Sequence, residues 1–388
     1  MPTRPVPFGD AVALTRALVA IDSRNPSLAA DAPGERACAE ALADVLAAWG
    51  FDVTLQDSGG ARPNVVARIG GAGEGRSLIL NGHLDTVGVE GMTHAPLDPA
   101  IRDGRLYGRG SADMKGGVAA MCAAAARAAR AGLAGRVIVT AVTDEEFRSQ
   151  GTAAVLAAGI RADAAIVTEP TRLAICPAHR GFAWLELVVH GRAAHGSRWD
   201  LGVDAITLAS LVVAELDAYQ RDVLAARTHP LLGRPSFHAS LIDGGIGLST
   251  YPDRCSVRFE RRTITGERAE DFAAEVQAAI VRVQARRPEL RADVLPGFAQ
   301  GPNDVPASHA IVRALADALA ATSLAAPIEG LSCWTDAALL TAAGVPAICF
   351  GPGDIGLAHA AAEYVPVHEI EQASAALESL VRSWCGSA

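Results

Sequence analysis

A short apolar segment that ends in a histidine and an aspartate constrains the fold of this chain more than any other feature. Residues 77–80 are apolar after the first, and His83 and Asp85 follow them. Runs of this length are typical of a strand buried on both faces of a sheet. Because residues i and i+2 of a strand point the same way, His83 and Asp85 share one side. Active sites of open α/β sheets lie at such strand ends, although an ordinary polar strand end is the simpler alternative.

The first 177 residues alternate between short apolar strands and helices. Helical spacing of apolar residues covers residues 10–21 and 35–49, and an Ala-rich helix follows the Gly-rich segment 103–117. Strands are predicted over residues 51–55, 64–69, 77–80, 136–142 and 164–167. This βαβ alternation predicts an α/β fold, a mainly parallel sheet with helices on both faces.

The pattern changes after Pro177. Half-exposed strands are predicted over 182–189, 236–242, 254–262 and 290–295, and amphipathic helices over 203–219 and 269–286. Two helices on an antiparallel sheet predict an inserted α+β domain. The first pattern returns with helices over 309–320, 335–343 and 370–384 and a strand over 346–350. We therefore expect a domain formed by residues 1–177 and 295–388, interrupted by an inserted domain over 178–294.

Composition narrows the class of protein. The 388 residues carry a net charge of −9, which argues against nucleic acid or an anionic membrane as the main partner. Residues 1–7 contain no apolar signal-peptide core, and the apolar stretch 118–126 is too short to span a bilayer. The seven cysteines are scattered and lack metal-ligand spacing, so we expect reduced thiols in a cytoplasmic protein.

Acids and histidines follow the predicted strands at several places: His83 and Asp85, Asp113, Glu145 and Glu146, Glu169, and His359. The carboxyl ends of parallel strands meet at one edge of a sheet, so these groups can converge. Nitrogen and oxygen ligands suit Zn²⁺ and are compatible with Mn²⁺ or Co²⁺. Each also has a plain alternative: a helix N-cap for the aspartate at 113, first-turn acids at 145 and 146, and solvated ends at 169 and 359.

Six motifs, in order along the chain, carry a resemblance to a known family. They are Gly-His-Leu-Asp-Thr at 82–86, Gly-Arg-Gly-Ser-Ala-Asp-Met-Lys-Gly at 108–116, Asp-Glu-Glu at 144–146, Glu-Pro-Thr at 169–171, Gly-Arg-Ala-Ala-His at 191–195 and Ala-His at 358–359. The chain resembles the di-zinc amidohydrolases and exopeptidases that include acetylornithine deacetylase, succinyl-diaminopimelate desuccinylase, aminoacylase and glutamate carboxypeptidase. The acetylornithine deacetylase and desuccinylase branch is the most similar.

The resemblance implies a pair of divalent ions, most readily zinc. Asp113 would bridge them, with His83 and Glu169 completing one site and Glu146 and His359 the other. It further implies that the peptide bond after Asp113 is cis.

Two more roles follow from the same resemblance. Asp85 would orient His83 by accepting its second ring N–H. Glu145 would be the general base that activates water and returns the proton to the leaving amine.

The inserted domain would act as a lid and form a homodimer. His195 would reach the partner's active site and stabilise the oxyanion, with a turn histidine as the alternative. Arg261 would grip a substrate carboxylate, because guanidinium binds carboxylate in a bidentate manner. Arg258 or Arg262 are alternatives for that role, and all three are alternatively surface charges.

Two departures from the family pattern affect substrate binding. Ser249 stands where the family often has asparagine, so one amide contact to substrate is replaced by a hydroxyl. Cys333 and Trp334 stand where Gly-Gly often precedes Thr335, which we expect to bind substrate. Trp334 either lines the acyl pocket or packs in the core.

These observations predict a cytoplasmic, dimeric metallohydrolase that removes an acetyl, succinyl or similar N-acyl group from an amino acid. The first alternative is a metallo-exopeptidase, either a dipeptidase or a glutamate carboxypeptidase. A distant alternative is a non-catalytic binding protein on the same fold.

Overall fold

The computed structural model describes residues 5–60, 62–71 and 75–386. Residues 1–4, part of the segment expected to lack a secretory signal, lie outside the described residues. The chain divides into a first unit, Met1–Pro177 with Val305–Glu329 and Thr335–Ala388, and a second unit, Ala178–Asp304 with Gly330–Trp334. Among the helices that the structure describes, none has the length and apolar character needed to cross a membrane.

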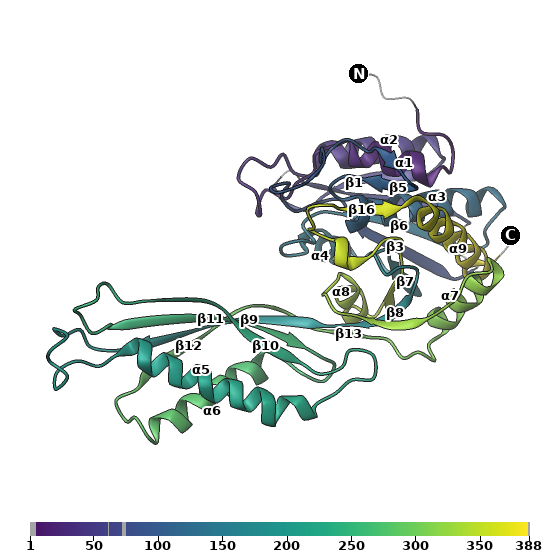
Figure 1. Cartoon of the computed structure of the whole chain (residues 1–388). Coiled ribbons are helices and arrows are strands. Elements are labelled where there is room, and N and C mark those ends of the chain that lie inside the picture. Colours follow the sequence, from purple (N-terminus) through teal and green to yellow (C-terminus); the bar gives the residue numbers. More distant parts are fainter. Residues whose placement is uncertain (1–4, 61, 72–74, 387–388) are drawn as a thin grey trace. The chain divides into compact units, whose positions relative to one another are not determined.

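A large sheet, most of it in the first unit, has the strand order β1-β2-β6-β3-β7-β15-β8-β13, and β14 pairs with β8 (Figure 1). Four central strands run parallel to one another: β6, β3, β7 and β15. The outer strands pair antiparallel with their neighbours: β1, β2, β8 and β13. The strands are β1 (Asp52–Asp57), β2 (Pro63–Gly70), β3 (Ser77–His83), β6 (Arg136–Val142), β7 (Ala164–Val167), β8 (Ile175–His179), β13 (Asn303–Asp304), β14 (Ile328–Leu331) and β15 (Ala347–Cys349).

Helices cover both faces of the sheet. Asn81 in β3 donates from Nδ2 to Oγ1 of Thr152 in α4 (Gln150–Ala157) at 3.2 Å. At the next residue, Gly82, an added Cβ atom would lie 2.9 Å from Cγ2 of Val118 in α3 (Gly116–Arg130), so glycine allows α3 its close approach. Successive strand residues point to opposite faces, so α3 and α4 lie on opposite sides. The α/β fold predicted from the sequence is confirmed.

Most residues of α3 are alanine, so the side chains on its surface are small. The helix is buried along nearly its whole length. Small side chains let neighbouring helices pack closely against it. The remaining helices of this unit are α1 (Ala11–Val19), α2 (Arg36–Ala48), α7 (Ala310–Ala321), α8 (Ala337–Ala342) and α9 (Val367–Cys385).

The second unit is an antiparallel sheet in the order β10-β11-β9-β12, with helices α5 and α6 packed on it through a common apolar core. Phe237, Phe259 and Phe272 pack together in that core at centroid distances of 5.8–6.4 Å. This is the architecture predicted for the inserted domain. The elements are β9 (Gly181–His190), α5 (Ala205–Asp222), η2 (Leu224–Ala226), β10 (Ser236–Gly244), β11 (Arg254–Thr263), α6 (Ala269–Gln284) and β12 (Arg291–Gln300).

The second boundary of the inserted domain differs from the prediction at residue 294. Strand β12 pairs with β9 as far as Gln300, and the second unit continues to Asp304. The predicted strand over 290–295 was too short, because the pairing resumes beyond an irregularity between Pro296 and Ala299. A bulge accommodates the proline without ending the strand.

Several short elements were not predicted because they contain too few residues to show a period. A small antiparallel sheet has the order β16-β5-β4. These elements are β4 (Ile101–Arg102), β5 (Arg105–Tyr107), η1 (Ser111–Lys115), η3 (Ile355–Leu357) and β16 (Tyr364–Pro366). Strand β8 was also not predicted; it contains Pro177, where the boundary of the inserted domain was expected.

Candidate metal centre and active site

His83 is the last residue of β3, at the buried edge of the sheet where the carboxyl ends of the parallel strands meet. Its Nε2 lies 3.1 Å from Oδ1 of Asp113, and its Nδ1 lies 2.9 Å from the backbone oxygen of Asp85. The predicted contact to the Asp85 carboxylate is wrong in this structure, because Oδ1 lies 3.7 Å from Nδ1 and the carbonyl is the nearer acceptor. Instead, the carboxylate accepts the backbone N–H groups of Glu145 and Glu146, each at 3.1 Å.

The carboxylate of Asp113 lies between two histidines. Oδ1 is 3.1 Å from Nε2 of His83, and Oδ2 is 3.5 Å from Nε2 of His359. The peptide bond between Asp113 and Met114 is cis, as predicted. The alternative role as a helix N-cap is not found, since α3 has no side-chain capping hydrogen bond. Each oxygen therefore faces a different imidazole, which suits a ligand shared by two cations.

Glu145 and Glu146 lie on the turn that follows β6. Oε2 of Glu146 lies 3.0 Å from Nε2 of His359, and Oε2 of Glu145 lies 4.0 Å from Nε2 of His83. The donor atoms of His83, Asp113 and Glu146 all lie within 4.8 Å of one another. These three side chains are therefore near enough to share one cation.

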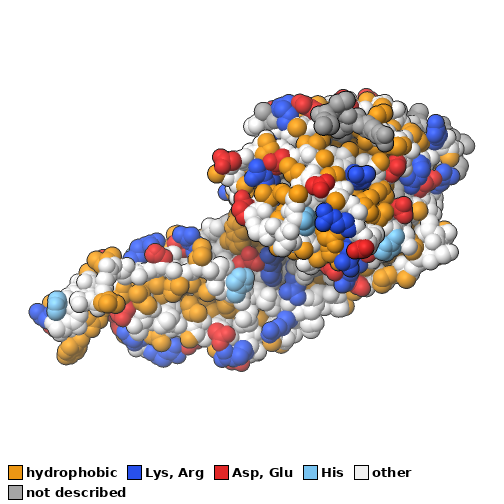
Figure 2. All heavy atoms as spheres, turned by 45° about the horizontal axis from the view of Figure 1, so that its top comes forward, with side chains coloured by type: hydrophobic (Ala, Val, Ile, Leu, Met, Phe, Trp, Pro, Cys, Tyr) orange, Lys and Arg blue, Asp and Glu red, His pale blue; other side chains and the backbone are white. Residues whose placement is uncertain are grey.

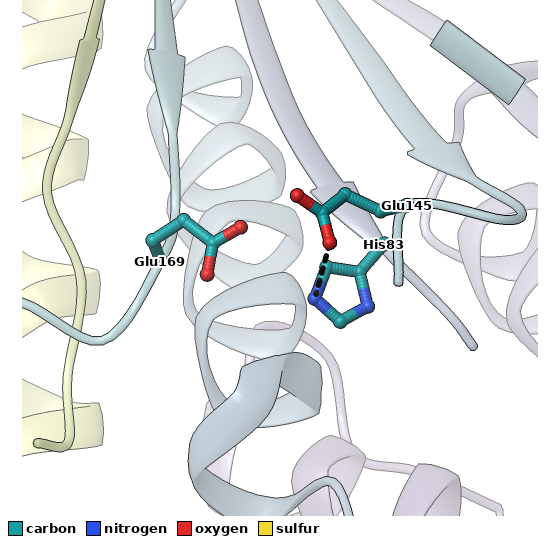
Figure 3. Close-up of side chains that lie close together, drawn as sticks. All are labelled: His83, Glu145 and Glu169. Atoms are coloured by element: carbon teal, nitrogen blue, oxygen red, sulfur yellow. Dashed lines mark ion pairs between the residues drawn. The ribbon is translucent and has the colours of Figure 1, made fainter. Parts of the chain in front are cut away.

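Glu169 follows β7 and belongs to a second group. Donor atoms of His83, Glu145 and Glu169 also lie within 4.8 Å of one another. Figure 3 shows the carboxylates of Glu145 and Glu169 turned toward each other beside the imidazole ring. Histidine nitrogens and carboxylate oxygens are donors that divalent zinc, cobalt and manganese accept, so the residues present fit such ions.

The crowding of carboxylates controls the protonation of the site. Burial, reinforced by the neighbouring charge of Glu169, raises the pKa of Glu145 well above its usual range. Burial and the charge of Asp113 raise the pKa of Glu146 to about 7. Hydrogen bonds to Asp113 and Glu146 raise the pKa of His359 to about 10. Without cations, the site therefore holds protons that offset the repulsion between its carboxylates.

Sequence reasoning missed Glu363, a fully buried acid that holds the segment carrying Asp113. Its Oε1 accepts the N–H groups of Ala112 and Asp113 at 3.0 and 3.2 Å. Its Oε2 accepts the N–H of Gly110 at 3.1 Å and NH1 of Arg109 at 2.6 Å. The one available signal was an acid four residues after the predicted histidine ligand.

His195 and Ser249 lie on neighbouring loops of the second unit. His195 forms an isolated β-bridge with Thr250, and the N–H of Gly196 donates to the Ser249 carbonyl at 2.7 Å. Nδ1 of His195 lies 2.8 Å from Oγ of Ser197, and the Ser249 side chain is exposed. The structure brings these two predicted residues together, whereas the predicted metal ligands all belong to the first unit.

Arg261 does not have the environment predicted for a residue that grips a substrate. Its side chain is only 2% exposed, and its guanidinium donates to Glu267 at 2.6 Å and Glu275 at 3.1 Å. Alternation along β11 turns it toward helix α6, whereas Arg258 and Arg262 face the opposite side of the sheet. Arg258 and Arg262, the alternatives for that role, have side chains that are 59% and 34% exposed.

Thr335, which was predicted to bind substrate, also has a different environment from the one expected. Its side chain is fully buried, its Oγ1 lies 3.2 Å from Sγ of Cys349, and it accepts the N–H of Ala337 at the start of α8. A hydroxyl engaged in this way holds the start of the helix. Trp334 donates from Nε1 to the carbonyl of Gly301 at 3.0 Å, as part of a partly exposed group of aromatic rings.

Six of the seven cysteines, all except Cys333, are buried free thiols. This agrees with the reduced state expected from their number and spacing.

The fold and the site define a class: an α/β protein whose parallel strand ends present histidines and carboxylates grouped as for a pair of divalent ions. Residues 79–383 match the profile of peptidase family M20/M25/M40, and the chain belongs to that family. The resemblance read from the motifs is thereby confirmed.

Similar proteins support this assignment. The chain is 34% identical over 339 residues to an acetylornithine deacetylase of Myxococcus xanthus, covering 86% of this chain and 87% of the relative. It is 30% identical over 363 residues to an N-acetyl-L-citrulline deacetylase of Xanthomonas campestris, covering 92% and 93%.

Solved structures share the fold. Aminopeptidase PepT from Bacillus cereus superposes with a TM-score of 0.81 at 19% identity, over 99% of this chain and 100% of the other. The YXEP protein of Bacillus subtilis, described as a dinuclear metal-binding peptidase of family M20, gives 0.75 at 15% identity, over 96% and 97%.

Proposed function

We propose that this protein is a metal-dependent amide hydrolase that removes an N-acyl group, such as acetyl or succinyl, from an amino acid. The observation that carries the proposal is the Asp113 carboxylate between His83 and His359, with three glutamates around it. Relatives of at least 30% identity are deacetylases of amino acids, which supports the choice of an N-acyl substrate.

The proposed ligands divide around Asp113. His83 and Glu169 would hold one divalent ion, Glu146 and His359 the other, and Asp113 both. Bound ions supply Lewis acidity, lowering the pKa of a water and polarising a carbonyl. Zinc is the proposed metal because mixed histidine and carboxylate sites suit it, with cobalt or manganese as substitutes.

Glu145 is the proposed general base. It lies beside the ligand groups, 4.0 Å from His83, and its carboxylate makes no hydrogen bond to another side chain among the described residues. A free carboxylate in this position can take the proton of the attacking water. It can then deliver that proton to the amine nitrogen that leaves as the amide bond breaks.

We further propose a homodimer formed through the second unit, in which His195 stabilises the oxyanion in the partner's active site. Strand β10 is an edge of its sheet and is exposed over most of its length, including Leu241 at 59% and Ile242 at 64%. The following loop exposes Ile246 and Leu248, and Figure 2 shows hydrophobic side chains on the surface of this unit. Apolar edge strands of this kind pair with another strand. A cytoplasmic location is proposed from the free thiols.

The test is hydrolysis of a panel of N-acetyl, N-succinyl and N-formyl amino acids and of dipeptides, with zinc-loaded and chelator-treated protein. The proposal expects turnover of N-acyl amino acids that disappears on chelation and returns with metal. Turnover of dipeptides alone would favour the exopeptidase alternative, and no turnover of any amide would contradict the proposal.

A further inference from the structure

Asn25 lies outside every motif discussed above, yet its side chain is fully buried against the turn that carries Glu145 and Glu146. Its Nδ2 donates to Oδ2 of Asp85 at 2.9 Å and to Oδ1 of Asp144 at 3.1 Å. Both hydrogens of one amide are therefore used to join two buried carboxylates. Two like charges in a buried region repel each other unless a donor lies between them.

The carboxylates of Asp85 and Glu35 hold the backbone of the turn. Asp85 accepts the backbone N–H groups of Glu145 and Glu146, and the N–H of Asp144 donates to Oε1 of Glu35 at 3.3 Å. Three consecutive backbone donors thus end on buried carboxylates. Asp144 itself has a φ of 65°, a left-handed conformation that few residue types adopt readily. The position of the turn therefore depends on these side chains rather than on a helix or strand.

Asn25 is itself fixed on its backbone and its amide oxygen. Its N–H donates to the carbonyl of Thr86 at 2.8 Å, and its Oδ1 accepts the N–H of Ser27 at 2.9 Å. Thr86 directly follows Asp85, so Asn25 is held to the same strand end that it supports. An amide with every donor and acceptor used is pre-oriented, which is what a supporting group around a metal site requires.

Arg62 also belongs to this network, where it pairs with Glu35 and Asp144. Its guanidinium bonds Glu35 and Asp144 and not Asp85. Asn25 is therefore the side chain that links Asp85 to Asp144. We infer that Asn25 is a positioning residue, which fixes the base Glu145 and the ligand Glu146 by joining Asp85 to Asp144. This inference rests on the proposed function for its activity readout only.

The test compares Asn25→Ala with wild type and with Ser374→Ala, each as the full-length, metal-loaded protein. Ser374 is a matched control because it is equally buried in the first unit but bonds only Ala120 and Arg127. Measured quantities are kcat, KM, Tm, and the affinities of the two sites for Co²⁺ followed by absorbance. Co²⁺ titration needs no substrate and reports the ligand geometry directly.

For Asn25→Ala, we expect kcat to fall about 10- to 100-fold with KM within about twofold of wild type. One Co²⁺ site should weaken by a similar factor, while the other keeps its affinity. Ser374→Ala should lower Tm without these changes. The inference is overturned if kcat and both affinities stay within twofold of wild type, or if both sites weaken equally.

A double-mutant cycle tests the route through Asp85. In an Asp85→Asn background, Asn25→Ala should add less than a twofold further loss of kcat, because the acceptor is already altered. Full additivity would overturn the inference. If Asn25→Ala does not fold, Asn25→Ser is measured in the same way. An inactive wild type would contradict the proposed function alone, since the Co²⁺ titration would still test Asn25.

Discussion

Oδ1 of Asp113 lies 3.1 Å from Nε2 of His83, while the other oxygen of the same carboxylate lies 3.5 Å from Nε2 of His359. The two histidines come from opposite ends of the chain, one ending β3 and the other following the last strand of the parallel group. A single side chain that contacts both makes Asp113 the centre of the proposed site.

Replacement of Glu145 by glutamine should abolish the base and leave the proposed ligands in place. We expect kcat to fall by about 10²- to 10⁴-fold, the range usual for loss of a general base. Bound metal, measured by elemental analysis, should stay at the wild-type amount. Glu40→Gln, an exposed acid on α2 that pairs only with Arg36, is the matched control and should keep full activity. Normal turnover by Glu145→Gln would remove this residue from the mechanism.

Replacement of Arg261 by methionine should affect folding rather than substrate binding. The change removes the buried partner of Glu267 and Glu275 and leaves them only the partly exposed Arg227, at a cost of at most about 3–5 kcal/mol. Denaturant unfolding measures this loss. Arg262→Met, on the other face of the same strand, should cost far less and is the better candidate for a raised KM. A raised KM for Arg261→Met at unchanged stability would restore the role predicted from the sequence.

Three of the proposed metal ligands were predictable from strand ends: His83, Glu146 and Glu169 end or follow strands of the parallel group, whose carboxyl ends meet at one edge of the sheet. Asp113 lies in η1 before α3 and not after a parallel strand, so only the motif pattern indicated it. Arg261 could not be placed in the same way. A shift of one residue along β11 exchanges the two faces of the sheet, and three arginines within five positions leave the choice open.

Supporting residues were not predictable for a different reason. Glu363 contacts the segment of Asp113 across 250 positions of sequence, and Asn25 contacts Asp85 across 60. Neither belongs to an apolar period, and a buried acid or amide has no signature in a single sequence. Their roles depend on which backbone N–H groups the tertiary structure leaves to be paired.

The metal-free protein should lose stability as the pH rises. Glu146 has a pKa of about 7 against an ordinary value of 4.5, and His359 about 10 against 6.5. Both values are raised, so their contribution is complete below the ordinary values and is lost as the pH passes through the raised ones. Asp113 has a lowered pKa and stays ionised throughout this range.

Thermal unfolding with chelator should therefore give a Tm that falls between pH 6 and pH 9. Metal binding must displace these protons, so the rise in Tm on adding zinc should grow over the same range. A Tm of the chelated protein that rises with pH would contradict the assigned protonation.

The edge strand β10 should form the dimer interface. Ile242→Lys places a charge on this exposed apolar edge, and we expect it to shift the protein from dimer to monomer in sedimentation velocity. Val281→Lys is the matched control, since it is 56% exposed on α6, which packs beside β12 at the other edge of the sheet. A wild type that sediments as a monomer would contradict the proposed dimer.

The most direct test of the central claim is the number of metal ions bound by wild type and by Asp113→Ala. Equilibrium dialysis against zinc followed by elemental analysis should give two ions per wild-type chain. The variant should bind fewer than one, because both proposed sites share this carboxylate, and it should remain folded by circular dichroism. Two ions retained by Asp113→Ala, or none bound by the wild type, would contradict the account.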